Sequence, residues 1–392
     1  SKMKRGRLII RMPEGNSYNY GEDENAEPAI IHIRSHNFFA KCVQYGDIGL
    51  GEAYVDGDWD TDDISAVVAW FILNIDNAPS ISGSKTKTIA INFLKIINRI
   101  EHLLRPNSLK MSKNNIHEHY DLGNDFYKLF LDKDMQYSCA YFHNPNISLD
   151  QAQKDKKQHI INKLKIEENM NVLDIGCGWG GMAIEIAKST GANVKGITLS
   201  ENQFKTASER AQKEGLNDKV SFALQDYRKE NQQYDRIVSV GMFEHVGVKY
   251  FKTYFSKVND ILKENGVFLL HTIGQRSKPT ATSPWIRKYI FPGGYIPSLS
   301  EVMHETQKLN INVTDIEVLR LHYAHTLSRW YQNVIENKDK IVNMFDKRFF
   351  RMWEFYLLAS KYSFVNMGNV VFQIQIAKNI NNLPLTRNYI YN

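Results

Sequence analysis

From residue 172 to residue 274, short apolar runs alternate with stretches whose apolar residues recur at helical spacing. Each apolar run is bounded by glycine or polar residues, as the strands of a buried sheet are. The pattern predicts strands at 172–176, 193–199, 220–226, 234–243 and 266–274, with helices to about residue 190, over 201–214 after a Ser200 cap, and over about 248–263. Because strands and helices alternate over short connections, we expect a parallel, doubly wound α/β sheet with its ligand site at the carboxyl ends of the strands.

The first 110 residues have a different pattern, in which short apolar runs are separated by turns. The expected elements are a strand at 29–35, glycine-rich turns followed by a helix within 47–74, a polar linker at 76–88 and an amphipathic helix at 89–104. Thr61 or Asp62 is expected to cap the helix within 47–74. The amphipathic helix either packs on its domain core or touches lipid or a partner. We therefore predict a smaller N-terminal α+β domain over 1–110 and a catalytic domain over 111–392.

Two stretches flank the regular alternation, one on each side. Residues 151–166 form a basic helix, and we expect most of its lysines to lie on a solvated face. Residues 275–299 form a long loop that contains four prolines but also Trp285 and Phe291, which favours a functional lid over disorder. After the loop we expect a helix at 300–309, a strand at 311–320, a helical region over about 325–361 and a last strand at 370–378.

Composition narrows the class of protein. The chain has 392 residues, which is long enough for two domains, and no apolar run approaches the ~20 residues of a membrane span. The apolar part of the N-terminus is too short for a signal peptide. Three widely spaced cysteines suit neither a disulfide framework nor a zinc site, so we expect a reduced, cytoplasmic setting and no metal. The net charge of +6 is modest, and no basic stretch with interleaved aromatic residues indicates nucleic-acid binding.

The stretch VLDIGCGWGG (172–181) contains the candidate cofactor site. Its glycines allow a ligand to approach the backbone closely and leave N–H groups free to bind it. A nicotinamide site would need an acidic residue at the end of the next strand, and GITLS (196–200) has none. The phosphate-binding pattern of P-loop proteins is also absent. Asp174, two residues before three alternate glycines, is instead typical of the first motif of class I S-adenosylmethionine-dependent methyltransferases.

Further motifs make a resemblance specific. They are HYDLGNDFY (119–127), MQYSCAYF (135–142), GITLSENQ (196–203), DRIVSVGMFEHVG (235–247), FLLHTIG (268–274), PWIRKYIFPGG (284–294), HYAHTLSRW (322–330) and, nearer the N-terminus, GLGEAYVDGDWD (49–60). With these motifs the chain resembles the cyclopropane-fatty-acyl-phospholipid synthases, which are related to the mycolic acid cyclopropane synthases. The resemblance implies that a methylene group is transferred from S-adenosylmethionine to the cis double bond of an acyl chain in a membrane phospholipid.

This reaction leaves a carbocation that must be shielded from water and must lose a proton. Aromatic residues around 120–142 and 285–295 would stabilise the cation. The family is understood to hold a bicarbonate ion as the base. Carried over to this chain, its polar cage is Cys139, Glu244, His271, the backbone of Ile273, and Tyr323. The resemblance implies that Glu244 accepts a hydrogen bond from the bicarbonate OH, while His271 and Tyr323 donate.

Cofactor contacts follow from the glycine loop and the resemblance together. The expected residues are Tyr137, Ser138, Gly176, Gly178, Thr198, Leu199, Gln203, Asp226, Tyr227 and Arg228. Thr198, Leu199 and Gln203 would face the ribose. Tyr227 stands where many relatives carry tryptophan and would stack on the adenine. Tyr120 is expected to line the substrate site, and Gly180 and Gly181 serve either the cofactor or close helix packing.

The resemblance also implies partners and a location. We expect a peripheral enzyme at the inner face of the membrane, a homodimer, and an N-terminal domain that presents phospholipid or mediates the dimer contact. Three alternatives stay open at this point. They are an acyl-chain methyltransferase that makes a methyl-branched or methylene product, an inactive lipid-binding module that keeps the fold, and a small-molecule methyltransferase.

Overall fold

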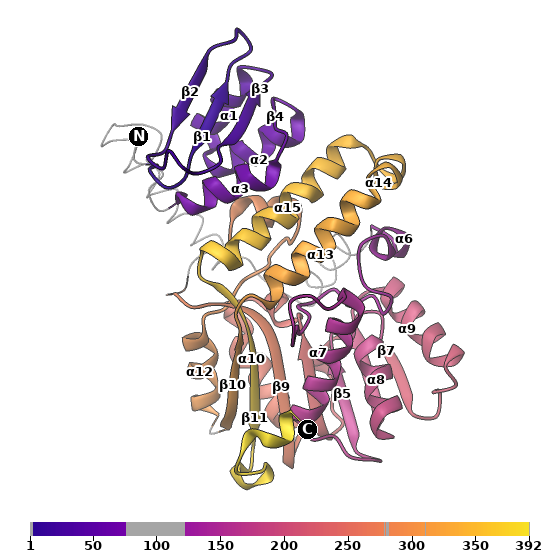
Figure 1. Cartoon of the computed structure of the whole chain (residues 1–392). Helices are drawn as coiled ribbons and strands as arrows, with labels where there is room; N and C mark the ends of the chain where they lie inside the picture. The colour runs from indigo at the N-terminus through magenta and orange to yellow at the C-terminus, as the bar shows by residue number, and fades with distance from the viewer. Residues whose placement is uncertain (1–2, 76–121, 278, 280–281, 310, 392) are drawn as a thin grey trace. The chain divides into compact units, whose positions relative to one another are not determined.

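The computed structural model describes residues 3–75, 122–277, 279, 282–309 and 311–391. Tyr120, the expected linker at 76–88 and the expected helix at 89–104 lie outside the described residues. The chain divides into two compact units (Figure 1). The first comprises Ser1–Leu104, Ser283–Ile290 and Leu327–Gly368, and the second comprises Arg105–Thr282, Phe291–Thr326 and Asn369–Asn392.

The second unit is built on a seven-stranded sheet of order β10-β11-β9-β8-β5-β6-β7 (Figure 1). Its strands are β5 (Asn171–Ile175), β6 (Asn193–Thr198), β7 (Val220–Leu224), β8 (Tyr234–Val240), β9 (Leu262–Gln275), β10 (Asn312–Leu319) and β11 (Asn369–Ala377). Strands β5 to β9 are parallel, whereas β11 is antiparallel to both neighbours, β9 and β10. The predicted doubly wound sheet is therefore confirmed, with one antiparallel strand added.

Helices cover both faces of this sheet. They are α7 (Leu149–Leu164), α8 (Gly181–Thr190), α9 (Glu201–Lys213), α10 (Phe251–Ile261) and α12 (Leu299–Lys308). The unit also contains the short helix α6 (Asn124–Lys128) and 3-10 turns at Tyr227–Lys229, Phe243–His245, Val248–Tyr250, Ile380–Asn382 and Arg387–Ile390. Successive strand residues point to opposite faces. Val172 thus packs in a core with α7, α8 and α9, whereas Leu173 packs in a core with α10 and α12. The Ser200 cap of α9 is confirmed, since its Oγ accepts a hydrogen bond from the Gln203 N–H.

The predicted solvated lysine face of helix α7 is wrong. Lys156 and Lys163 are 0% exposed and Lys157 is 6% exposed, whereas Lys154 is exposed. Burial of these side chains is possible because acceptors from distant parts of the chain meet them. Glu317 of β10, for example, accepts from Lys163. Helical spacing alone does not show whether such acceptors exist.

The first unit contains a four-stranded sheet of order β2-β1-β3-β4. Its elements are β1 (Leu8–Arg11), β2 (Ser17–Tyr20), β3 (Ala29–Ile33), α1 (Asn37–Tyr45), α2 (Asp47–Asp56), β4 (Trp59–Asp60), α3 (Ile64–Leu73), α11 (Pro284–Tyr289), the later part of α13 (His322–Glu336), α14 (Lys338–Met344) and α15 (Lys347–Asn366). The strand expected at 29–35 is confirmed as β3.

Two details within 47–74 differ from the expectation. The glycine-rich stretch forms helix α2 rather than turns. A Cβ atom at Gly51 would lie 2.6 Å from Trp285 Nε1 and 2.9 Å from Phe355 Cε1, so glycine permits a close packing that outweighs its low helix propensity. Helix α3 is capped by Asp63 rather than Thr61 or Asp62, because Asp63 Oδ1 accepts from the Ala66 N–H at 3.0 Å.

The first unit combines the N-terminal residues with two stretches from the C-terminal half, so the units are not consecutive segments divided near residue 110. Helix α15 packs against α2 and α3. A buried hydrogen bond of 2.6 Å joins Tyr54 to Glu354, and the Arg351 guanidinium lies 3.8 Å from the centre of the Tyr54 ring. Within the described residues, no helix is long and apolar enough to cross a bilayer.

Candidate functional site

A pocket of about 130 Å³ lies at the carboxyl ends of β5, β6 and β8. It is lined by Met135, Gln136, Tyr137, Ser138, Asp174, Ile175, Gly176, Cys177, Gly178, Trp179, Met182, Ile197, Thr198, Leu199, Gln203, Gln225, Tyr227, Val240, Gly241, Met242, His245 and Val246. This is the edge where parallel α/β sheets bind ligands. The pocket therefore lies where the strand pattern predicted it.

The glycine turn between β5 and α8 forms one wall. Gly176 and Gly178 have φ angles of +82° and +55°, which favour glycine. The Gly176 N–H donates to the Ile197 carbonyl at 2.9 Å, which fixes the turn to β6. A Cβ atom at Gly176 would lie 2.7 Å from Met242 Cβ, whereas one at Gly178 would meet no atom within 4 Å. Gly178 thus leaves open space in which a ligand can approach the backbone.

Most of the predicted cofactor residues line this pocket. They are Tyr137, Ser138, Gly176, Gly178, Thr198, Leu199, Gln203 and Tyr227. The Thr198 hydroxyl donates to Gln203 Oε1 at 2.9 Å, so two side chains expected at the ribose already orient each other. The Tyr227 ring is held edge-on against Tyr254, with 5.2 Å between ring centres.

Asp226 and Arg228 are placed differently, since neither lines the pocket. They bind each other, with Arg228 Nε 2.8 Å from Asp226 Oδ1 and the terminal nitrogen 2.7 Å from Oδ2. The Arg228 backbone N–H also donates to Asp226 Oδ1 at 2.9 Å. The pair thus links the two residues on either side of Tyr227 in the turn that follows β7.

In the sequence Asp174 only marks the first methyltransferase motif, but in the structure it lies in the pocket wall. Its Oδ2 atom is buried and has no hydrogen-bond partner among the described residues. Burial raises the pKa of this carboxyl to about 7. A buried acceptor without a partner suits a ligand that carries a positive charge or an N–H group.

Other pocket residues were missed for a different reason. Met242 and His245 follow β8 at the same edge as Glu244, so their position at a strand end could have indicated them. Burial lowers the pKa of His245 to about 4, so its ring is neutral at pH 7. Gln136 and Trp179 lie beside residues that were predicted, but no pattern in the sequence distinguishes them.

Three of the expected cage residues are brought together by β8 and β9. Glu244 Oε1 accepts from the Ile273 N–H at 2.7 Å, and the His271 carbonyl accepts from the Gly241 N–H at 2.9 Å. Glu244 Oε2 and His271 Nε2 are both buried without a hydrogen-bond partner among the described residues. Burial raises the pKa of Glu244 to about 7, even though the Ile273 N–H favours its ionised form.

The His271 ring has a defined tautomer in this arrangement. Burial lowers its pKa well below the usual value, so the ring is neutral. As the Gln373 amide is oriented, the Nε2 atom of Gln373 donates a hydrogen bond to Nδ1 of His271 at 3.2 Å. The ring proton then lies on Nε2, the atom without a partner. His271 therefore offers a buried N–H donor two residues before Ile273, whose N–H binds the Glu244 carboxyl.

Cys139 and Tyr323 are carried by two segments that lie against each other. The Ala140 N–H donates to Thr326 Oγ1 at 3.0 Å, and Thr326 lies about one helical turn after Tyr323 in α13. Cys139 Sγ donates to the Ala140 carbonyl at 3.3 Å. Burial raises the pKa of the Cys139 thiol, so it is a neutral donor rather than a nucleophile.

The chain is similar to known proteins over most of its length. The family model described as mycolic acid cyclopropane synthetase matches residues 107–374. The cyclopropane-fatty-acyl-phospholipid synthase of Escherichia coli K12 is 36% identical over 95% of this chain and 96% of its own length. The similarity therefore extends over both units.

Two further known proteins are similar over 70% or more of the chain. The tuberculostearic acid methyltransferase of Mycobacterium tuberculosis is 32% identical over 91% of this chain and 85% of its own length. A crystal structure of a mycolic acid cyclopropane synthase complexed with SAH and CTAB is 30% identical, with a TM-score of 0.64 over 70% of this chain and 99% of that chain.

Proposed function

Because this chain belongs to the mycolic acid cyclopropane synthetase family, we propose that it converts the cis double bond of an unsaturated phospholipid acyl chain into a cyclopropane ring, with S-adenosylmethionine as donor. Membership confirms two predictions made from the sequence, namely the class I methyltransferase fold and an S-adenosylmethionine-dependent enzyme. The observation that carries the finer proposal is the pair of partnerless buried atoms, Glu244 Oε2 and His271 Nε2, at adjoining strand ends.

The pocket residues fit S-adenosylmethionine. The open space at Gly178 admits a ligand to the backbone, and Asp174 Oδ2 can accept a hydrogen bond from its amino group. Thr198 and Gln203 would contact the ribose, and Tyr227 the adenine. When bound, this cofactor supplies an electrophilic methyl group on a sulfonium centre.

The cage residues fit a small anion that carries a proton. Neutral His271 offers an N–H donor, and Glu244 has a second oxygen that can accept from an O–H group. Tyr323 would add an O–H donor, and the Cys139 S–H would add another on turning from the Ala140 carbonyl that it binds in this structure. A bicarbonate ion held there would supply the base for the reaction, so Glu244, His271, Ile273, Cys139 and Tyr323 would hold it in place.

The remaining chemistry follows from the acyl chain. Its double bond would attack the methyl carbon, so that a C–C bond forms as the C–S bond breaks, S-adenosylhomocysteine leaves and a carbocation remains on the chain. The ring would close when the former methyl carbon loses a proton to the bicarbonate ion and bonds to the cationic carbon. Glu244 Oε2 and the His271 side chain are buried, and such a setting would keep out water, which would otherwise trap the cation as an alcohol.

A second candidate function is transfer that gives a methyl-branched or methylene product. It is favoured by the similarity to the tuberculostearic acid methyltransferase. The same carbocation is formed in both reactions. The reactions differ in the step that follows, in which the cation either closes to a ring or gives a methyl-branched or methylene chain. The pocket does not distinguish them, because both need the same cofactor.

Product analysis tests the proposal directly. The full-length chain is incubated with S-adenosylmethionine and liposomes of phospholipids with cis-unsaturated chains, and the lipids are analysed by mass spectrometry and NMR. A gain of one CH₂ with a high-field cyclopropane proton signal supports the proposal. A methyl-branched or methylene chain would overturn it in favour of the second candidate. Turnover on a soluble amine or phenol, with none on liposomes, would indicate a small-molecule methyltransferase.

We also propose a peripheral, cytoplasmic enzyme at the inner membrane face that works as a homodimer. The support is the similarity to a phospholipid synthase over 95% of the chain. In this proposal residues 1–110 present phospholipid or form the dimer contact. Co-sedimentation with liposomes and the mass in solution by light scattering test the two parts separately. A protein that stays in the supernatant, or a monomer, contradicts the corresponding part.

A further inference from the structure

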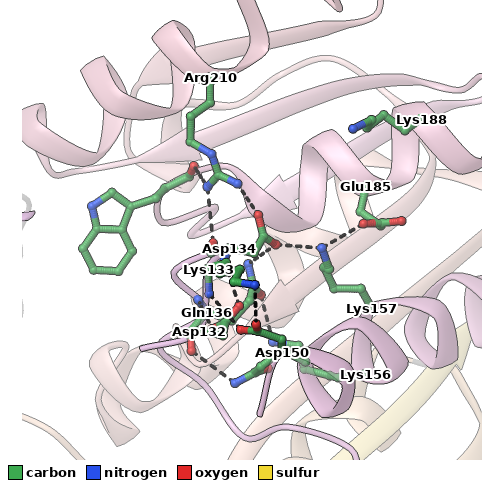
Figure 2. Close-up of polar contacts among 12 residues, drawn as sticks. Asp132, Lys133, Asp134, Gln136, Asp150, Lys156, Lys157, Glu185, Lys188 and Arg210 are labelled. Carbon is green, nitrogen blue, oxygen red and sulfur yellow. Dashed lines mark hydrogen bonds and ion pairs between the residues drawn. The ribbon is translucent and has the colours of Figure 1, made fainter. Parts of the chain in front are cut away.

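One face of helix α7 is polar and buried, and it contacts the segment that lines the cofactor pocket (Figure 2). Gln153, Lys156 and Lys157 share this face because residues three and four apart lie together on a helix. All three side chains bind residues of the segment 134–138. We call this segment, which includes the pocket residues Gln136, Tyr137 and Ser138, the cofactor segment.

Lys156 and Gln153 both donate hydrogen bonds to the cofactor segment. The Lys156 ammonium donates to Gln136 Oε1 and to Ser138 Oγ, both at 2.8 Å. Gln153 Nε2 donates to the backbone carbonyls of the same two residues, at 3.2 Å and 2.9 Å. Four hydrogen bonds from one helix turn thus fix the residues on both sides of Tyr137.

A second set of contacts joins this segment to the glycine turn. Asp134 is bound by Lys157 at 2.7 Å and by Arg210 of α9 (Figure 2). Arg210 also donates to the Trp179 carbonyl at 2.8 Å. A Cβ atom at Gly181 would lie 2.2 Å from Gln136 Nε2, so the cofactor segment lies close against the start of α8.

The partners of Lys156 differ from those of the other buried lysines in α7. Lys157 and Lys163 bind carboxylates, namely Asp134 with Glu185, and Glu317. Lys156 instead donates to two neutral atoms of pocket residues. Burial lowers its pKa to about 8, although the nearby Asp132 carboxyl favours the charged form. Burying an ammonium on neutral acceptors costs stability compared with an apolar side chain of the same length. A role in orienting the pocket residues Gln136 and Ser138 would account for a lysine at position 156.

We propose that Lys156 is a positioning residue of the cofactor site, and that with Gln153 it holds Gln136 and Ser138 in the geometry that binds the cofactor. The inference rests on the proposed function only for the identity of the cofactor. It predicts that loss of the ammonium weakens cofactor binding without unfolding the chain. A residue with only a structural role would change stability and affinity together.

The test uses Lys156→Met, which keeps an unbranched side chain only one atom shorter and removes the ammonium with both of its hydrogen bonds. Lys154→Met is the matched control, because Lys154 lies on the exposed face of the same helix. Binding of S-adenosylhomocysteine to the full-length chain is measured by calorimetry without lipid, together with Tm without ligand. We expect Kd to rise at least tenfold in Lys156→Met, with Tm within a few degrees of the unsubstituted chain. Lys154→Met is expected to match the unsubstituted chain in both.

A second variant covers the case in which Lys156→Met does not fold. Gln153→Met removes the two bonds to the backbone carbonyls and no charge, and it should also weaken binding of S-adenosylhomocysteine. An unchanged Kd in a folded Lys156→Met, or in Gln153→Met when Lys156→Met unfolds, would overturn the proposal. Because these measurements contain no lipid, they are independent of which acyl product is formed. In the liposome assay, the KM for S-adenosylmethionine should rise while kcat at saturation stays within about threefold.

Discussion

Glu244 Oε1 accepts a 2.7 Å hydrogen bond from the Ile273 N–H, which fixes the carboxyl group that follows β8 to the end of β9. The bond uses one carboxyl oxygen and leaves Oε2 buried without a partner among the described residues. The side chain is thus oriented by the backbone of the neighbouring strand. Its free oxygen is presented to whatever group occupies the cage.

The first prediction concerns the charge on that oxygen. Glu244→Gln keeps the shape and the hydrogen bond from Ile273 to an oxygen, but it replaces the second acceptor with an NH₂ donor. Because positioned acid and base groups contribute about 10²- to 10⁴-fold, we expect methyl transfer to liposomes to fall at least about 100-fold. The readout is radiolabel transferred from S-adenosylmethionine into extracted lipid. Unchanged binding of S-adenosylhomocysteine is the control, and full activity would remove Glu244 from the proposed cage.

The second prediction concerns pH and Asp174. Its pKa is about 7 in the folded chain and near 3.8 in an unfolded one, so between these values the folded chain holds a proton that the unfolded chain releases. Stability therefore falls as pH rises through this window. Asp174→Asn should flatten the profile and raise stability at pH 8 by about 1–3 kcal/mol, since one pKa unit corresponds to about 1.4 kcal/mol.

This is measured as Tm against pH from 5 to 8 without ligand. Asp260→Asn, at an exposed position on α10, is the control and should leave the profile unchanged. Parallel profiles for Asp174→Asn and the unsubstituted chain would contradict the assignment. Glu244 contributes with the same sign, so some slope should remain in Asp174→Asn.

The third prediction separates backbone strain from ligand contact at Gly178. Gly178 and Gly215 have similar positive φ angles, +55° and +67°, and a Cβ atom at either would meet no atom within 4 Å. Alanine should cost about 1–2 kcal/mol of stability at both sites. Only Gly178 lines the pocket, so Gly178→Ala alone should weaken S-adenosylhomocysteine binding, by about tenfold or more. Equal affinities in the two variants would show that the turn does not touch the ligand.

The fourth prediction concerns the buried cluster at the other end of α7. Glu317 Oε2 is bound by His159 at 2.6 Å and by Lys163. These two groups outweigh the effect of burial and lower the pKa of Glu317 to about 2. Its charge therefore stabilises the fold above about pH 4.5, and this contribution is lost as pH falls towards 2.

Glu317→Gln leaves Lys163 buried without a carboxylate, which we expect to cost about 3–5 kcal/mol at pH 7. Urea unfolding at pH 7 and pH 3 measures the effect, which should be smaller at the lower pH. Glu305→Gln in α12, whose partner Lys308 is half exposed, should cost less than about 1 kcal/mol. A similar cost at both pH values would show that packing, not charge, holds the cluster.

The order of strands and helices in the second unit was predictable because its pattern is local. Apolar runs of strand length, the glycine turn after β5 and the Ser200 cap each act within a few residues. The sequence did not reveal that β11 inserts antiparallel between β9 and β10, because strand order depends on contacts between distant segments. The glycines of α2 misled the prediction for the same reason, since Trp285 and Phe355, which contact Gly51, are remote in sequence.

In the candidate site, too, features set by nearby residues were predictable, whereas features set by distant contacts were not. The glycine turn and the strand ends placed the pocket, and the family motifs supplied Tyr137, Ser138 and the cage residues. The buried lysines of α7 could not be foreseen, because a basic amphipathic helix has the same spacing whether its lysines meet water or acceptors. The pairing of Asp226 with Arg228 was also hidden, since two charged residues after a strand can point to a ligand or to each other.

The first unit is assembled from three separate stretches of chain. This limits which fragments of the protein can fold when they are expressed alone. Helix α15 buries Trp353 and Phe355 in a unit that residues 1–104 help to build. Expression of residues 111–392 alone would leave that apolar surface without its covering, so such a fragment should aggregate or bind a chaperone. During synthesis, α15 can pack in the unit of the N-terminal sheet only after nearly the whole chain has left the ribosome. Its assembly therefore depends on contacts about 300 residues apart, such as that between Tyr54 and Glu354.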